Sequence, residues 1–238
     1  MAASQADVKD RIASIQNIRK ITRAMEMVAA ARLRRAEQRI EALRPYASAI
    51  RRMTRQAAEA AGAEVSSMPV LQEHETVSKV AILLVTGDRG LAGAFNSQII
   101  RAGTRRANEL RPEGAEVLWY ASGRRGISSL AFRELELGGS WAGFTDRPSF
   151  ADARAIADGL AAAYVDGKVD RVEVFYNGYI SPVNQEVRHE PLLPLQQADV
   201  MGDEDDEDKD DDDPHSRAHW LYEPDPEDWA SGSAASWV

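Results

Sequence analysis

One stretch of the sequence, residues 8–60, constrains the fold more than any other. Apolar residues recur in it every three to five positions, from Val8 to Leu43, which is the spacing of one face of an α-helix and not the alternation of a strand. Between Ser14 and Arg44 there is no Gly or Pro, and strong helix formers dominate. We therefore predict a single helix, roughly 75–80 Å long at 1.5 Å per residue.

A helix of this length cannot bury its apolar stripe on a small domain. Globular helices average ~11–12 residues, and most of their stability comes from packing an apolar face. Pro45 removes one backbone donor and predicts a kink near residues 41–43, after which the apolar spacing resumes and continues to about residue 61. The stripe therefore requires a partner helix along most of its length, or a surrounding protein.

The middle of this helix, residues 20–36, combines small side chains with positive charge. Four alanines, at positions 24 and 29–31, make a slim neck that another backbone can approach closely. Its guanidinium groups belong to Arg23, Arg32, Arg34 and Arg35. Residues 1–60 hold 13 Lys and Arg against 6 Asp and Glu, a net charge of +7 in a chain of net charge -9. The neck is either a solvated coiled-coil surface or a shaft that docks against acidic surfaces.

Residues 76–196 carry the pattern of an α/β domain. Short apolar runs predict buried strands at residues 79–86, 116–121 and 171–179, with a further edge strand at 184–191. Segments of helical period lie between them, at residues 91–110, 127–134 and 149–166. Residues 123–126 read as a turn and residues 138–148 as a loop. The alternation predicts a Rossmann-like, three-layer α/β domain with a mainly parallel sheet.

The sequence offers little chemistry for catalysis. Gly87, Gly90 and Gly93 follow a strand, yet their spacing matches neither the dinucleotide fingerprint nor the P-loop, so a structural turn is favoured there. Asp88 and Arg89 are expected to form an ion pair in this turn. There is no Cys, and the four His residues lack metal-ligand spacing and are expected on the surface or in loops. We predict no catalytic residue, cofactor or metal.

Larger partners of other classes are also disfavoured. The sequence argues against nucleic acid as a ligand, because the arginines are spread around the predicted helix and the chain as a whole is acidic. No run approaches the ~18 apolar residues of a membrane span, so we expect a soluble or peripheral protein without direct membrane insertion.

An acidic tract separates the predicted domain from the end of the chain. Residues 199–213 contain 11 Asp and Glu and one Lys, a charge of about -10, and like charges at this density do not fold on themselves. We predict a disordered, solvated loop over residues 197–219, whose deletion changes stability little. Residues 220–226 become apolar and Pro-rich again, and residues 229–238 carry no structural signal.

Four motifs, in this order and at these spacings, resemble one family. They are KITRAMEMVAAARLRRA at residues 20–36, RPYA at 44–47, DRGLAGAFN at 88–96 and YEPDP at 222–226. Together they resemble the gamma subunit of the rotary proton-translocating ATP synthase. The family's usual Cys is Ala92 here, which exchanges one small residue for another.

The resemblance implies a non-catalytic central stalk at the cytoplasmic face of the bacterial cell membrane. Its partners would be the alpha and beta subunits, the epsilon subunit and the membrane c-ring. Residues 1–62 would form the shaft, one half of an antiparallel coiled coil. Arg23, Met25, Arg32, Arg34 and Arg35 would face the alpha/beta hexamer, and the foot at residues 220–238 would place Trp220, Tyr222 and Glu223 near epsilon and the ring.

In the family the foot is followed by a second long helix that winds along the first. Here the resemblance ends near residue 228, so we expect a shortened shaft, weak coupling and self-association through the exposed stripe. A reading-frame shift after Asp228 is the expected cause, and a naturally short variant is the alternative.

Two other functions fit the pattern. One is a stand-alone nucleotide-dependent α/β enzyme with a coiled-coil arm, which would bind nucleotide at residues 87–93. The other is a coiled-coil adaptor that forms a homodimer through the stripe.

Overall fold

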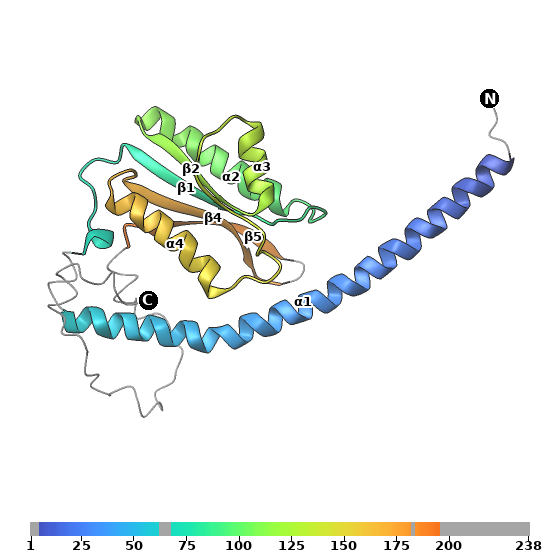
Figure 1. The fold of residues 1–238 in the computed structure, drawn as a ribbon, viewed down its shortest axis with the longest axis horizontal. Helices are drawn as coiled ribbons and strands as arrows, with labels where there is room; N and C mark the ends of the chain where they lie inside the picture. The colour runs from blue at the N-terminus through green and yellow to red at the C-terminus, as the bar shows by residue number, and fades with distance from the viewer. Residues whose placement is uncertain (1–4, 62–67, 182–183, 196–238) are drawn as a thin grey trace. The chain divides into compact units, whose positions relative to one another are not determined.

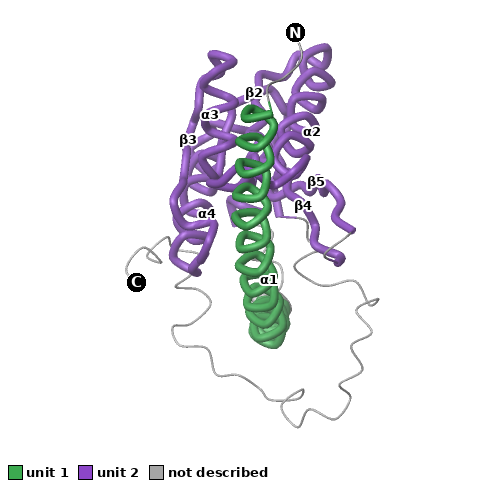
Figure 2. Tube along the Cα trace, turned by 90° about the vertical axis from the view of Figure 1, so that its right-hand side faces the viewer, with its two compact units in different colours: residues 1–57 green, residues 58–238 purple. Residues whose placement is uncertain are grey.

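A computed structural model describes residues 5–61, 68–181 and 184–195 of the chain. The chain divides into two compact units, residues 1–57 and residues 58–238, which Figure 2 colours separately. The acidic tract, the foot residues Trp220, Tyr222 and Glu223, and the histidines His215 and His219 lie outside the described residues. Our predictions for those segments remain predictions.

The first unit is a single helix, α1 (Gln5–Ala61), of 57 residues. It runs without interruption past Pro45, and Figure 1 shows it gently curved along its length. At 1.5 Å per residue it is about 85 Å long. The predicted long helix is therefore confirmed. It forms because its sequence keeps the 3.6-residue period and contains no glycine.

The second unit is built on a five-stranded sheet of order β3-β2-β1-β4-β5. Its strands are β1 (Lys79–Val85), β2 (Glu116–Ser122), β3 (Leu137–Trp141), β4 (Arg171–Tyr179) and β5 (Gln185–Leu193). The first four are parallel, and β5 pairs antiparallel with β4. In the centre, Ile82 of β1 lies between Trp119 of β2 and Glu173 of β4. The predicted α/β class with a mainly parallel sheet is confirmed.

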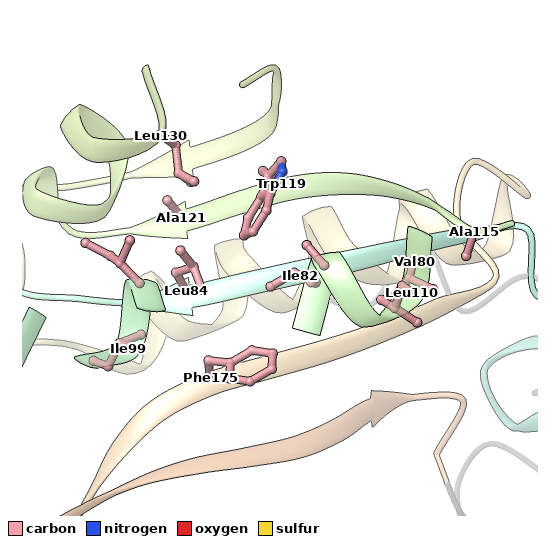
Figure 3. Close-up of a cluster of buried hydrophobic side chains, with 12 residues drawn as sticks. Val80, Ile82, Leu84, Ile99, Leu110, Ala115, Trp119, Ala121, Leu130 and Phe175 are labelled. Atoms are coloured by element: carbon pink, nitrogen blue, oxygen red, sulfur yellow. The ribbon is translucent and has the colours of Figure 1, made fainter. Parts of the chain in front are cut away.

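Helices cover both faces of this sheet (Figure 1). Three are α-helices, α2 (Phe95–Leu110), α3 (Arg124–Phe132) and α4 (Phe150–Val165), and two are short 3-10 helices, Pro69–Leu71 and Arg111–Glu113. Val80, Ile82 and Leu84 of β1 pack with the side chains of α2 and α3, as Figure 3 shows, whereas Ala81 and Leu83 pack with those of α4. Both faces of β1 are buried, which explains its continuous apolar run.

The predicted loop at residues 138–148 is wrong, because its first part is the edge strand β3. This strand has no alternating pattern of its own and is set by pairing with β2. A Cβ at Gly138 would lie 2.7 Å from the ring of Tyr120, and one at Gly139 would lie 3.0 Å from the same ring. The two glycines thus make room for a buried aromatic ring, which is a tertiary requirement that reads as a loop in the sequence.

Two helix starts also differ from our predictions. The helix α2 begins at Phe95 and not at residue 91, because Leu91 and Gly93 have φ angles of 59° and 55°, which a right-handed helix excludes. The helix α3 begins at Arg124, inside the predicted turn at residues 123–126. Only Gly123 has a positive φ there, of 93°, and a Cβ on it would lie 2.1 Å from the carbonyl oxygen of Thr86.

The start of α4 depends on a local cap. Ser149 accepts a hydrogen bond from the backbone of Asp152, and the Asp152 carboxylate accepts one in return, which completes a capping box. Leu160 and Tyr164 of this helix are fully buried, whereas Phe150, its first residue, is exposed.

Candidate functional site

The predicted contact residues of the neck all lie on α1, and all are exposed. Successive residues of an α-helix are 100° apart, so Arg23 and Arg34 leave one side of the helix. Met25 and Arg32 leave the opposite side, and Arg35 lies between them. The five residues therefore spread over more than half of the circumference of the helix instead of forming one face, and the structure does not bring them together into a pocket.

Two polar side chains of the neck, Arg23 and Thr22, make contacts within the helix. Arg23 and Glu26 form an ion pair of 3.6 Å whose side chains are 75% and 70% exposed, and such a pair stabilises a helix by only ~0.2–0.5 kcal/mol. The Thr22 hydroxyl donates to the carbonyl oxygens of Ile18 and Arg19, at 3.1 and 3.0 Å. The Arg23 guanidinium thus remains available to a partner, whereas the Thr22 hydroxyl is satisfied within the helix.

The apolar stripe of α1 is exposed along the helix. Its large apolar residues, from Val8 to Met53, are each 37–62% exposed. Isolated apolar residues on a surface are ordinary, but a contiguous row of this length marks an interaction surface.

The turn after β1 tests the nucleotide-binding alternative. The Asn96 side chain accepts a hydrogen bond of 2.8 Å from the backbone of Gly87, and Asn177 donates to the carbonyl oxygen of Phe95 at 3.2 Å. These bonds tie the first turn of α2 to the ends of β1 and β4, where the dinucleotide of a Rossmann fold would bind.

A carboxylate occupies the donors that a phosphate would use. Asp88 accepts hydrogen bonds from the backbone N–H groups of Arg124 (3.0 Å), Gly143 (2.9 Å) and Thr145 (3.2 Å), and from the Thr145 hydroxyl (2.9 Å). Burial opposes ionisation of Asp88, but these bonds outweigh it and hold its pKa below the ordinary value. An ionised, satisfied carboxylate at this edge disfavours phosphate binding.

The expected ion pair between Asp88 and Arg89 is wrong. Arg89 pairs with Asp146, while Asp88 faces backbone donors of two other loops. Neighbours in sequence point apart here, because the Asp88 side chain is drawn to the N-terminus of α3.

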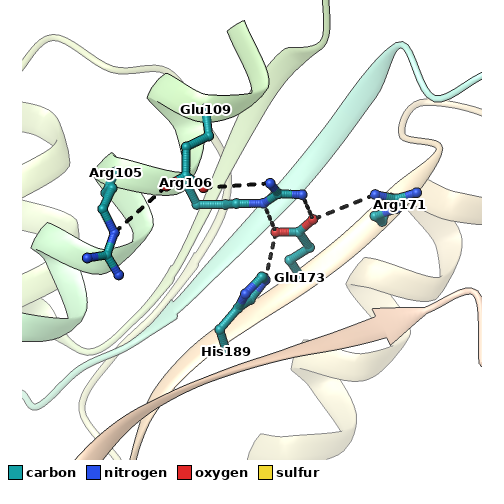
Figure 4. Close-up of polar contacts among 6 residues, drawn as sticks. All are labelled: Arg105, Arg106, Glu109, Arg171, Glu173 and His189. Carbon is teal, nitrogen blue, oxygen red and sulfur yellow. Dashed lines mark hydrogen bonds and ion pairs between the residues drawn. The ribbon is translucent and has the colours of Figure 1, made fainter. Parts of the chain in front are cut away.

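A buried acid at the centre of the domain was missed by the sequence analysis. Glu173 of β4 is 3% exposed and receives two hydrogen bonds of 3.0 Å from Arg106 of α2. His189 of β5 lies 2.8 Å from the same carboxylate, and Arg171 lies 4.0 Å away (Figure 4). Burial opposes ionisation of Glu173, but the hydrogen bonds and charge of Arg106 lower its pKa overall. The detectable signal was an acid inside an apolar strand.

His189 is exposed, as expected, but its side chain also makes contacts within the domain. Its ring stacks on Phe175 at 4.3 Å as well as meeting Glu173. The cluster of Arg106, Glu173 and His189 joins α2, β4 and β5, which fixes the antiparallel strand β5 to the sheet.

A second acid fixes the start of the sheet. Asp170 accepts hydrogen bonds from the backbone of Ser78 and of Lys79, both 2.8 Å, and from the Ser78 hydroxyl at 2.9 Å. His74 lies 2.8 Å from its other oxygen and stacks on Tyr164 at 4.6 Å. Burial opposes ionisation, but the bonds from His74, Lys79 and Ser78 hold the pKa of Asp170 far below its usual range. His74 lies in a loop, as expected, but its role is structural.

Neither a metal-binding cluster nor a membrane-spanning helix is found among the residues that the structure describes. Over residues 5–61, 68–181 and 184–195 no three His, Asp or Glu side chains are arranged to hold a metal ion. Over the same ranges no helix combines the length and the hydropathy of a membrane span.

Comparison with known proteins decides the family. The family model described as ATP synthase matches residues 4–234, nearly the whole chain and six residues past the point where we expected the resemblance to end. An ATP synthase gamma chain from Mycolicibacterium vanbaalenii is 33% identical over 241 residues, covering 95% of this chain and 75% of the relative. The chain belongs to the ATP synthase gamma chain family.

Other gamma chains are more similar over a shorter range. That of Kineococcus radiotolerans is 40% identical over 200 residues, covering 82% of this chain and 65% of the relative. That of Thermobifida fusca is 39% identical over 204 residues, covering 84% and 66%. The chain thus spans slightly less than two thirds of the length of these two gamma chains.

Solved structures agree on the fold. The central stalk and c-ring structure of the Tetrahymena thermophila mitochondrial ATP synthase contains a chain with a TM-score of 0.58 and 24% identity, covering 89% of this chain and 84% of that one. The rotor of the Euglena gracilis enzyme gives a TM-score of 0.54 at 18% identity, with coverage of 78% and 61%. At these identities the likeness concerns the fold alone.

Proposed function

We propose that this chain is the non-catalytic shaft subunit of a rotary ATP synthase. Proton flow through the membrane ring would turn it, and the turning shaft would drive the catalytic sites of the alpha and beta subunits through their binding changes. One observation carries the proposal, namely that a 57-residue helix exposes a continuous apolar stripe and several arginines. A helix with these properties requires surrounding protein.

The neck is the part of the shaft that we place within the alpha/beta hexamer. Its alanines leave a narrow rod, so that surrounding loops can pass close to the backbone. Arg23, Met25, Arg32, Arg34 and Arg35 point in different directions, so at every angle of rotation some of them face acidic loops of the beta subunits. Exposed charges act over about a Debye length, ~8–10 Å, and attract a partner without fixing one geometry.

The rest of the chain would connect the shaft to the membrane side. We place the α/β domain, residues 76–196, and the foot residues Trp220, Tyr222 and Glu223 against the epsilon subunit and the c-ring. The solvated acidic loop at residues 197–219 would lie between them. The protein would be peripheral, at the cytoplasmic face of the cell membrane.

The alternatives have less support. A nucleotide-dependent enzyme needs free donors at the end of β1, and these are bound by Asn96 and by the Asp88 carboxylate. A simple homodimeric adaptor explains the stripe but gives no reason for a basic, alanine-rich neck.

Co-purification tests the proposal. The tagged full chain is co-expressed with the alpha and beta subunits of the same organism, and the eluted complex is examined by native mass spectrometry. We expect one copy of the chain per three alpha and three beta subunits. A chain in which Ala24 and Ala29 are both changed to Trp widens the neck and should not enter the hexamer, whereas Ala153→Trp on the exposed side of α4 should. Elution of the wild-type chain as a homodimer without alpha and beta would contradict the proposal.

A further inference from the structure

A groove of about 460 Å³ runs between α2 and α3 on the outer side of the domain, and its charged lining is entirely basic. Arg101 and Arg105 of α2 face Arg133, which follows α3, and the polar side chains of Thr104 and Asn108 lie among them. Three guanidinium groups thus share one concavity on a chain whose net charge is -9.

These arginines are not neutralised by their neighbours. Arg101 and Arg133 form no ion pair within the described residues, and Arg105 reaches Glu109 only at 3.9 Å, with both side chains more than half exposed. The next acid in sequence is Glu134, which has a positive φ of 58° and does not line the groove. Arg106 on the same helix shows the contrast, because its charge is matched by the buried Glu173.

The groove also holds unused hydrogen-bond donors. Arg133 donates to the Thr104 hydroxyl at 3.1 Å, and that hydroxyl donates to the carbonyl oxygen of Ile100 at 2.7 Å. A guanidinium carries five N–H donors in a planar fork, so most donors of Arg133 and all those of Arg101 remain open. Guanidinium forks bind carboxylates in pairs of parallel hydrogen bonds, so this groove suits a segment rich in Asp and Glu.

We propose that the occupant is the acidic tract of the same chain, residues 203–213. This segment holds ten Asp and Glu and one Lys, so its charge of -9 is opposite to that of the groove. It is bound to the domain through a short stretch of chain, which raises its effective concentration near the groove far above that of any separate acidic protein.

The tract can reach the groove from the end of the sheet. Residue 203 lies eight positions after Leu195 and residue 213 lies 18 positions after it, which allows spans of up to about 29 Å and 65 Å. A domain of some 120 residues is about 35 Å across. The chain length therefore permits docking on any face of the domain.

Charge density selects the groove over the shaft helix. The arginines of the neck point in several directions, so an extended tract can meet few of them at once. The groove presents three on one surface. Docking of this kind leaves the tract extended and hydrated, and exposed ion pairs contribute only ~0–1 kcal/mol each. The proposal thus agrees with a small effect of the tract on stability, and it implies that the groove is closed to other polyanions.

The sequence contains no cysteine, so a disulfide can form only between cysteines that are introduced for a cross-linking test. Asp208→Cys in the tract is combined with Asn108→Cys in the groove, with Ala153→Cys on α4 across the sheet, or with Ala31→Cys on α1. Asn108, Ala153 and Ala31 are all exposed helical positions. The rate of intramolecular disulfide formation in the full, dilute chain is measured on the monomer band, at about 0.1 M and about 1 M salt.

We expect the Asn108 pair to cross-link at least about tenfold faster than the Ala153 pair at low salt. The difference should vanish at about 1 M salt, where the Debye length is ~3 Å, and in the Arg101→Gln, Arg133→Gln double variant. The Arg154→Gln variant, on α4, should retain the difference in rate between the Asn108 and Ala153 pairs. Equal rates for positions 108 and 153, or a fastest rate for position 31, would overturn the proposal. Neither result would affect the proposed role of the shaft.

Discussion

Arg106 of α2 and Glu173 of β4 form two parallel hydrogen bonds of 3.0 Å across the face of the sheet. The carboxylate is 3% exposed, and the arginine side chain is 22% exposed. In the sheet, Ile82 of β1 pairs with Glu173 of β4 on one side and with Trp119 of β2 on the other, so Glu173 lies beside the central strand. A charged pair in this position fixes α2 to the central strands, and its loss should be costly.

Glu173→Gln should therefore destabilise the α/β domain. The variant leaves the Arg106 charge without its partner in a mostly buried site, and breaking a buried pair costs about 3–5 kcal/mol. We expect a loss of about 2–4 kcal/mol in urea unfolding, since Arg106 is partly solvated. Glu109→Gln, at a 53% exposed position of the same helix, should cost less than about 0.5 kcal/mol. Similar losses of stability in both variants would show that the buried Arg106–Glu173 pair stabilises the domain no more than an exposed pair does.

The Asp170 cluster predicts an acid-sensitive domain. Its carboxyl has a lower pKa folded than unfolded, so the unfolded state binds more protons and the free energy of unfolding rises with pH. The contribution of Asp170 is complete above its unfolded pKa of ~3.9 and is lost as the pH falls toward the folded value. Asp170→Asn should lower stability at pH 7 and flatten its dependence below about pH 4. Asp158→Asn, an exposed control on α4, should change neither.

Alanine substitutions at two glycines distinguish the cost of a steric clash from the cost of an unfavourable backbone conformation. Gly123 and Gly143 both have positive φ, 93° and 98°, but only Gly123 has an atom near its missing Cβ, the Thr86 carbonyl oxygen at 2.1 Å. Gly143→Ala should cost about 1–2 kcal/mol from conformation alone. Gly123→Ala should cost at least about 2 kcal/mol more, since the clash is with backbone. Thermal unfolding of the two variants gives the comparison, and equal costs would refute the close approach of α3 to β1.

The proposed place of the neck predicts an uncoupling variant. Met25→Lys adds a charge at the contact with the beta subunits, so proton pumping per ATP should fall in membrane vesicles while assembly is retained. Met53→Lys is a matched control, because Met53 is exposed to a similar degree on the same helix, at 55% against 51% for Met25. Unchanged pumping in Met25→Lys would count against the placement of the neck in the hexamer.

The exposed stripe predicts association of the isolated chain. Ile15, Ile18 and Ile21 are 56–60% exposed, and covering each of them in a dimer is worth up to about 1.5–3 kcal/mol. Sedimentation should show concentration-dependent self-association that Ile15→Glu with Ile18→Glu abolishes. Phe150→Glu, at an exposed apolar position of the α/β domain, should leave it intact.

The long helix and the central strands follow from the sequence alone. Their signals are local: the 3.6-residue period from Val8 to Leu43 fixes α1, and the continuous apolar run at β1 requires burial on both faces. The apolar pattern of β4 is interrupted by Glu173 but still predicts a strand. The order of strands and helices then limits the topology to a few parallel arrangements.

Other features depended on tertiary contacts between distant residues. The strand β3 is a strand because β2 offers it an edge, and its glycines accommodate Tyr120. The start of α3 is set by the close approach of Gly123 to Thr86 and by the Asp88 carboxylate. His189 and Glu173 meet because β5 pairs antiparallel with β4. Periodicity within a segment records which of its faces is buried, but it cannot record which distant side chain will lie against that face.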